Sequence, residues 1–297
     1  MIRLTQRSYR LMLILLVAAL SLPLSASLAQ DGTPEPSASP AAIAVPAPGE
    51  SPAIDKILAN GTLRAGVAIA PPWLLQDPAT MEYYGPAADV IERIGEELGV
   101  PVEYVDSGWD VLIAGLQSDK FDLTAAPMFA TPARMEVIDF VNYTSAGTCY
   151  FTKADNAEIN SLEDLNSGDV TIVTFTGTGT EEGIREKYPE ATINSIVQPP
   201  GGQPPIEDVL AGRADVGPFD SPLAIFLAQQ YPDLKIIPQD PEYCIANADI
   251  PFPIGMGFNK NDPAFTAFLQ SVVDAMQEDL DAAILEYSDP KYMAPAT

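Results

Sequence analysis

The chain has 297 residues, of which 41 are acidic, 15 are basic and none is histidine, so its formal net charge is −26. Nucleic-acid binding needs basic surface to displace counterions, and we therefore expect no nucleic-acid partner. The absence of histidine excludes a serine–histidine–aspartate triad and most zinc mechanisms. We expect neither a metal nor a cofactor.

The N-terminus predicts export. Arg3, Arg7 and Arg10 precede an apolar run from Leu11 to Leu22, and Ser27-Leu28-Ala29 offers the small residues that a signal peptidase reads. We predict a signal peptide over residues 1–29 and a mature protein in the periplasm or at the cell surface. An uncleaved membrane anchor is the alternative, although this run is shorter than the roughly 20 apolar residues of a spanning helix.

A linker is expected next. Residues 31–52 contain six prolines together with Ala, Ser, Gly and Glu, and they have no aromatic and few branched side chains, the kinds that offset ordering entropy. We predict a disordered linker over residues 30–52 and a folded part from Ala53 to Thr297. Loss of residues 1–29 removes three basic residues and no acidic ones, which takes the net charge to −29.

Strands and helices alternate in the first part of the folded region. Leu63 to Ile69 alternates as a strand, and Val90 to Leu98 carries the apolar stripe of a helix. The segment PVEYV, a helix from Trp109 and a buried strand over Leu123 to Met128 complete this unit. The alternation is typical of an α/β unit with a parallel sheet.

A second α/β unit begins near Gly147. Its predicted strands are VTIVTF, ATINSI, ADVGPF and LKIIP, and its predicted helices are Glu181 to Tyr188, Ile206 to Ala211 and Pro222 to Gln230. IGMGFNK then predicts one more strand, and Ala264 to Leu280 and Ala282 to Tyr287 predict two terminal helices.

Among the possible binding residues, the sequence pattern points first to Arg134. It follows the buried strand and a TPA turn in a run where Lys120 is the one other basic residue. Ligands of open α/β sheets lie outside the strand ends, and a guanidinium is a two-pronged donor suited to a carboxylate. A surface ion pair with Glu136 or Asp139 is the structural alternative.

Cys149 and Cys244 are the two cysteines of the chain. An even pair in an exported protein favours a disulfide, and two buried free thiols are the alternative.

Several phrases in this order resemble the extracellular solute-binding proteins of ABC importers that carry polar amino acids. They are GTLRAGVAIAPPW, GPAADVIERIGEELGV, the stretch from WDVLIAGL to TPAR, SLEDLNSGDVTIVTFTGTGTE, VLAGRADVGPFDS and IGMGFNKNDPAF. The resemblance implies a two-lobed α/β fold of the type II periplasmic-binding-protein kind, with two hinge strands and in each lobe a mixed sheet flanked by helices. It places lobe 1 at 53–144 plus 255–297 and lobe 2 at 145–254.

The resemblance also implies a ligand site between the lobes. In the family, the arginine that follows the TPAR-like turn grips the carboxylate of the ligand, and Arg134 matches it. Thr178 and Thr180 match the turn that also touches the carboxylate, although Thr178 with Glu181 fits a helix capping box as well. Asp220 matches the ammonium-binding carboxylate, with a helix N-cap as its alternative. Trp73 matches an aromatic residue that packs on the ligand, with core packing as its alternative.

The segment Ala126-Pro127-Met128-Phe129 departs from the family pattern, which has small hydroxyl residues and glycines there. Pro127 cannot donate a backbone hydrogen bond, and Phe129 and Met128 put apolar side chains at the predicted site. We therefore expect an amino acid or related carboxylate-bearing solute and a pocket more apolar than one for a basic amino acid. The implied partner is an ABC importer permease, and we expect a monomer.

Two other functions remain open at this stage. A periplasmic cyclohexadienyl (prephenate/arogenate) dehydratase has this fold and needs a general acid, for which Glu181 or Glu182 would serve if burial raised its pKa. A ligand-sensing adaptor could use the same two-lobed module to signal to a separate partner. We predict a binding protein and no enzyme activity.

Overall fold

The computed structural model describes residues 43–199 and 204–293. The predicted signal peptide and the predicted linker up to residue 42 lie outside the described residues. The end of that linker is structured: Ile43 packs against the core of the first lobe, and Ser51 is buried. The Ser51 hydroxyl accepts a hydrogen bond from the Ile54 N–H and donates one to Asp262, so it caps helix α1 (Pro52–Asn60) and fixes it to the lobe.

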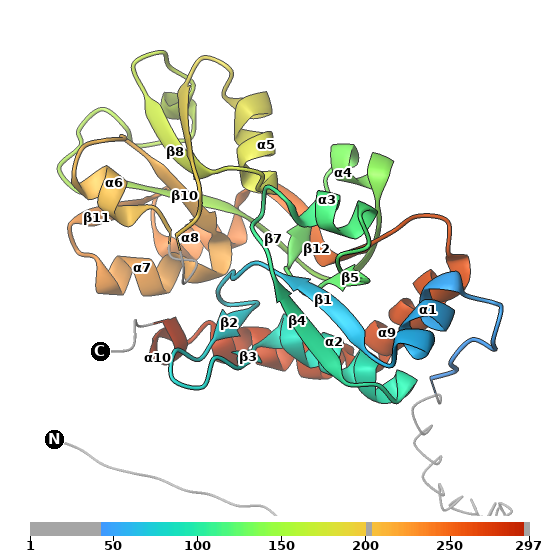
Figure 1. Cartoon of the computed structure of the whole chain (residues 1–297). Coiled ribbons are helices and arrows are strands. Elements are labelled where there is room, and N and C mark those ends of the chain that lie inside the picture. The colour runs from blue at the N-terminus through green and yellow to red at the C-terminus, as the bar shows by residue number, and fades with distance from the viewer. Residues whose placement is uncertain (1–42, 200–203, 294–297) are drawn as a thin grey trace, which may run out of the picture. The chain divides into compact units, whose positions relative to one another are not determined.

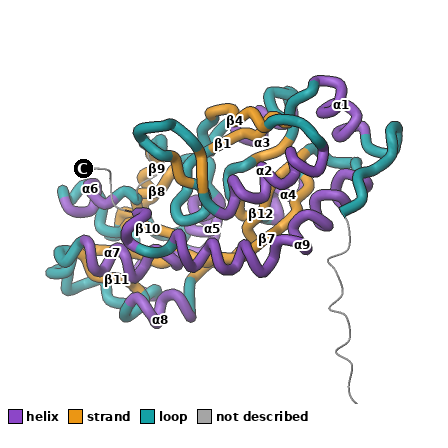
Figure 2. The backbone as a smooth tube through the Cα atoms, turned by 90° about the horizontal axis from the view of Figure 1, so that it is seen from below, coloured by secondary structure: helices purple, strands orange, loops and turns teal. Residues whose placement is uncertain are grey.

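The first lobe is built on parallel strands flanked by helices. Strand β1 (Leu63–Val67) lies between β4 (Val102–Asp106) and β5 (Leu123–Thr124), both parallel to it. Helices α2 (Pro86–Leu98) and α9 (Pro263–Tyr287) share one apolar cluster, and α3 (Leu112–Gln117) belongs to another. Two short strands, β2 (Leu75–Gln76) and β3 (Tyr83–Tyr84), pair beside α2. Figure 2 shows α9 running below both lobes.

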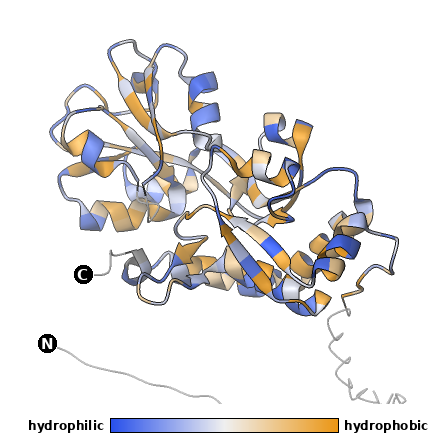
Figure 3. Ribbon diagram, in the orientation of Figure 1, coloured by the Kyte–Doolittle hydropathy of each residue, from blue (hydrophilic) through white to orange (hydrophobic). Residues whose placement is uncertain are grey.

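The second lobe mixes parallel and antiparallel pairs. Strands β10 (Gly217–Asp220) and β11 (Leu234–Ile237) are antiparallel to β7 (Asp139–Lys153), whereas β8 (Thr171–Phe175) and β9 (Thr192–Ile196) are parallel to each other. The helices of this lobe are α5 (Gly179–Lys187), α6 (Ile206–Leu210), α7 (Ala224–Gln230) and α8 (Pro241–Ala246), and 3-10 turns cover Glu163–Leu165 and Ser221–Leu223. In Figure 3 the strands are largely apolar and the outer face of α5 is polar.

Two long antiparallel strands join the lobes, as Figure 1 shows. They are β7 and β12 (Asp249–Phe258), and in their register Ile254 lies opposite Thr144 and Pro253 opposite Ser145. The lobe boundaries that the sequence predicts, 144/145 and 254/255, lie on these two strands and stay a prediction. The mixed α/β architecture with two hinge strands agrees with the predicted fold class.

The predicted disulfide is present. Cys149 of β7 and Cys244 of α8 are bonded, with their Cα atoms 6.0 Å apart, and both are fully buried. The bond ties α8 to the hinge strand within the second lobe.

Two predicted elements differ from the structure. The strand expected over Leu123 to Met128 is split into β5, which pairs with β1 and β12, and β6 (Met128–Phe129), which pairs with β12, because Pro127 between them cannot donate to a ladder. The two predicted terminal helices are one continuous helix, α9, followed by the short α10 (Pro290–Met293), since Asp281 is tolerated on an exposed helical face. Within residues 43–199 and 204–293, no helix is both long and apolar enough to span a membrane.

Candidate functional site

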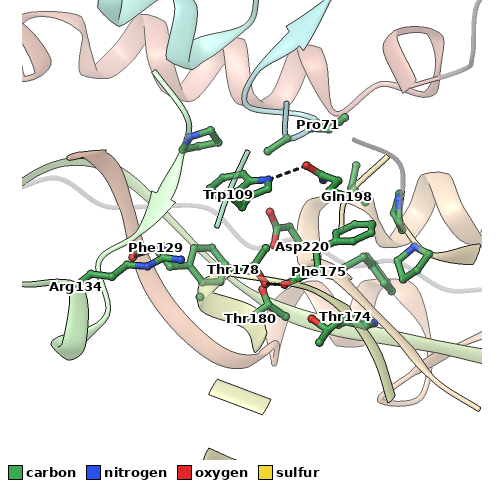
Figure 4. A pocket seen from close by; sticks show the side chains of 18 residues that line it. Pro71, Trp109, Phe129, Arg134, Thr174, Phe175, Thr178, Thr180, Gln198 and Asp220 are labelled. Carbon is green, nitrogen blue, oxygen red and sulfur yellow. Dashed lines mark hydrogen bonds between the residues drawn. The ribbon is translucent and has the colours of Figure 1, made fainter. Parts of the chain in front are cut away.

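A pocket opens between the two lobes, and Figure 4 shows its side chains. It is open to solvent, and its cavity volume is about 90 Å³. The first lobe contributes apolar side chains and one arginine: Ala70, Pro71, Trp109, Pro127, Phe129 and Arg134. The second lobe contributes the α5 turn, the end of β10 and two loops: Thr174, Phe175, Thr178, Gly179, Thr180, Gln198, Pro204, Pro205, Pro218, Phe219, Asp220 and Leu223.

Arg134 lies in the short helix α4 (Pro132–Val137), whose N-cap is Thr131. Its side chain is 2% exposed and reaches the second lobe, where Nη2 donates to the Gly177 carbonyl at 2.6 Å. Its Nη1 donates to the Phe129 carbonyl at 3.1 Å. Its ion pair is with Glu182, at 3.5 Å, and not with Glu136 or Asp139. Burial lowers the pKa of Arg134, and the Glu182 carboxylate opposes this shift.

The turn before α5 faces the pocket at Thr178 and Thr180. Thr178 is also the N-cap of α5: its hydroxyl accepts from the Glu181 N–H at 3.1 Å and donates to the Phe175 carbonyl at 2.9 Å. The capping role of Thr178 is therefore present, and its contact with a ligand carboxylate stays a prediction. The free N–H groups of a helix N-terminus favour an anion.

Asp220 ends β10 and lines the pocket. Its Oδ2 accepts a hydrogen bond from Trp73 Nε1 at 3.2 Å, and its side chain makes no capping bond to the turn that follows. Burial raises the pKa of Asp220 to about 6, and the Trp73 hydrogen bond acts in the opposite direction. Asp220 as a whole residue is half-buried.

Trp73 and Met128 are not among the residues that line the pocket. Trp73 is 1% exposed in the core of the first lobe, and it acts on the site through the hydrogen bond to Asp220. Met128 is fully buried in the cluster beneath α3. Successive side chains of a strand point to opposite faces, so Phe129 faces the pocket and its neighbour Met128 cannot.

Sequence reasoning missed most of the lining residues, among them Trp109, Phe175, Gln198 and Phe219. Trp109 looked like the start of an apolar helix stripe, but α3 begins three residues later. Its Nε1 instead donates to the Gln198 side chain of the other lobe at 2.8 Å. For Phe219 a signal existed, because it directly precedes Asp220, whereas Gln198 lies in a loop without any motif.

We expect Gly177→Ala to weaken solute binding about tenfold by hindering lobe closure. Gly177 has φ +80°, and a Cβ there would lie 2.7 Å from the Asp110 Cα of the other lobe. The matched control is Gly61→Ala, which adds the same backbone strain at φ +70° but meets no atom within 4 Å. Calorimetry should show weaker binding in the first variant alone. Equal affinities would contradict the closed contact at Gly177.

The fold and the interlobe pocket define a type II periplasmic binding protein. The family model of the bacterial extracellular solute-binding proteins, family 3, matches residues 63–287 of this chain. The chain belongs to this family.

The individual relatives described next share 26–35% sequence identity with the matched part of this chain. A probable amino-acid ABC transporter-binding protein of Haemophilus influenzae is 35% identical over 26% of this chain and 30% of its own length. Cyclohexadienyl dehydratase of Pseudomonas aeruginosa is 26% identical over 63% of this chain and 70% of its own. The crystal structure of an ancestral amino acid-binding protein, a precursor of cyclohexadienyl dehydratase, superposes with a TM-score of 0.65 at 30% identity, covering 81% of this chain and 99% of that one. The chain thus spans less than a third of the length of the Haemophilus relative that it matches.

Proposed function

We propose that this protein binds an amino acid, or a closely related carboxylate-bearing solute, between its lobes and delivers it to the permease of an ABC importer. The observation that carries the proposal is a pair of opposite charges in one pocket. Among the described lining residues, Arg134 of the first lobe and Asp220 of the second carry charge. A zwitterion can satisfy both, and it does so best when the lobes are closed. The protein acts as an exported monomer.

In this proposal, the solute carboxylate lies at the α5 turn and Arg134. The turn offers the Thr180 hydroxyl and the first N–H groups of α5, and Arg134 offers positive charge. The ammonium group lies at Asp220. Phe129, Pro127 and Trp109 line the remaining wall. They favour an uncharged side chain, because burying a charge against them without a partner is costly.

A thermal-shift screen of amino acids and organic acids tests the proposal, with calorimetry on the best solute. At 100 times the dissociation constant, binding adds about 2.7 kcal/mol to the free energy of unfolding. We expect an amino acid with an apolar side chain to give the largest shift, and its amide, which lacks the carboxylate, to give none. A complete absence of shifts among amino and organic acids would contradict the proposed function.

The dehydratase relatives raise an enzyme as the second candidate, and we propose that the chain is not one. Burial acts to raise the pKa of Glu181, but hydrogen bonds from Ser195, Arg185 and the Gly177 N–H hold it below its ordinary value. Glu181 also does not line the pocket. Glu182 is bound to Thr131 and paired with Arg134. A general acid must hold a proton near neutral pH, which suits neither arrangement. Prephenate mixed with concentrated protein should remain unchanged; any turnover would restore the enzyme reading.

A further inference from the structure

Glu182 connects the two lobes beside the pocket. It lies on α5 of the second lobe, and its Oε2 accepts a hydrogen bond from the Thr131 hydroxyl of the first lobe at 2.8 Å. Its Oε1 lies 3.5 Å from Arg134 Nε. The Glu182 side chain is 42% exposed, whereas that of Arg134 is 2% exposed. One face of the carboxylate therefore touches solvent, and the other touches a buried cation.

Arg134 needs such a counter-ion. Its two terminal nitrogens donate to neutral carbonyls, those of Phe129 and Gly177, which do not compensate its charge. Its Nε is buried without a hydrogen-bond partner and points to the Glu182 carboxylate at a distance longer than a hydrogen bond. Among the described residues, Glu182 is the one acid within 4 Å of this guanidinium. A buried cation left without a counter-ion is strongly unfavourable.

Glu182 also changes the charge that a solute meets. Arg134 and Asp220 line the pocket, and Glu182 adds a second negative charge directly behind Arg134. The three groups together are net negative. A solute with one carboxylate places it beside Arg134 and places its ammonium group beside Asp220. Each of its two charges then has a partner of opposite sign. A second solute carboxylate would meet two protein carboxylates and a cation that is already paired.

We propose that Glu182 is a specificity-determining counter-ion of Arg134, and that it makes the closed site select solutes with a single carboxylate over dicarboxylic ones. The inference rests on the proposed function, since it assigns the charge of the solute at the same pocket. Glu182 acts through Arg134 as a positioning residue and need not touch the solute. The negative charge of Glu182 explains why the proposed site disfavours a solute with an acidic side chain.

The test compares glutamine with glutamate, which have nearly the same shape and differ in one charge. Calorimetry measures both on the wild type, on Glu182→Gln and on Glu186→Gln, an exposed acid of the same helix one turn further on. We expect the wild type to prefer glutamine, Glu182→Gln to reduce that preference about tenfold, and Glu186→Gln to leave it unchanged. Glu182→Asp, which restores the charge, should recover part of the preference. An unchanged ratio in Glu182→Gln would overturn the proposal.

A second measurement needs no solute. The Arg134 Nε–H signal, assigned by its loss in Arg134→Lys, is followed by NMR in protein labelled with ¹⁵N-arginine. Its exchange with water should be about tenfold faster in Glu182→Gln than in the wild type and in Glu186→Gln. If no amino or organic acid binds the wild type, the proposed function fails, and an unchanged exchange rate then separately overturns the role of Glu182.

Discussion

Arg134→Ala is expected to weaken binding of the best solute by at least about 30-fold. The variant removes the positive charge of the pocket and the donor to the Gly177 carbonyl of the other lobe at 2.6 Å. Truncating one partner of a buried, hydrogen-bonded charge pair costs about 2–5 kcal/mol, which corresponds to a factor of this size. Calorimetry on the solute identified by the thermal-shift screen measures the effect.

The loss has two sources, solute contact and lobe closure, and matched variants separate them. Arg134→Lys keeps the charge but not the planar fork, so we expect it to recover only part of the affinity. Arg213→Ala removes an arginine whose side chain is 56% exposed and paired with Asp208, and it should bind normally. The affinity for a solute without a carboxylate should not depend on the charge at Arg134. If Arg134→Ala left the affinity for a carboxylate-bearing solute unchanged, the site assignment would be wrong.

Much of the fold follows from sequence patterns that are local. The alternation from Leu63 and the apolar stripe of Val90 to Leu98 correspond to β1 and α2, because each buries one face against the same core. What local pattern misses is pairing between distant strands. Pro127 divides one apolar run into β5, which pairs with β1 and β12, and β6, which pairs with β12. No short window of sequence contains that information.

Part of the candidate site could also be predicted from local sequence patterns. Phrases such as TPAR and VGPFDS identify Arg134 and Asp220, and the structure brings both to one pocket. Trp73 was expected on the solute, but its indole is in the core and its N–H reaches Asp220 across the lobes. A contact between residues 147 positions apart depends on lobe closure. The pairing of Trp109 with Gln198 and of Arg134 with Glu182 is of this kind too.

Asp220→Asn should abolish amino-acid binding and at the same time stabilise the solute-free protein. Burial raises the pKa of Asp220 from 3.8 to about 6, so near neutral pH the folded protein holds an unfavourable charge there. Between pH 3.8 and about pH 6, the folded state binds more protons than the unfolded state. Stability therefore falls as pH rises from about 4 to 6 and is constant above. Removing the charge should add about 2 kcal/mol at pH 7, a figure reduced from the full shift because Asp220 is half-buried and not fully buried.

The pH profile distinguishes this cause from a general effect of an aspartate substitution. Urea unfolding of the solute-free protein should show the gain at pH 7 and its disappearance near pH 4, where both states of the wild type are protonated. Asp169→Asn, at an exposed position of the same lobe, should show no gain at either pH. In the wild type, binding of an ammonium-bearing solute should weaken up to about tenfold per pH unit below 6, because protonation removes its partner. A variant that lost binding but gained no stability would mean that the Asp220 charge is already compensated without the solute. The solute ammonium would then not be the group that makes burial of this carboxylate favourable.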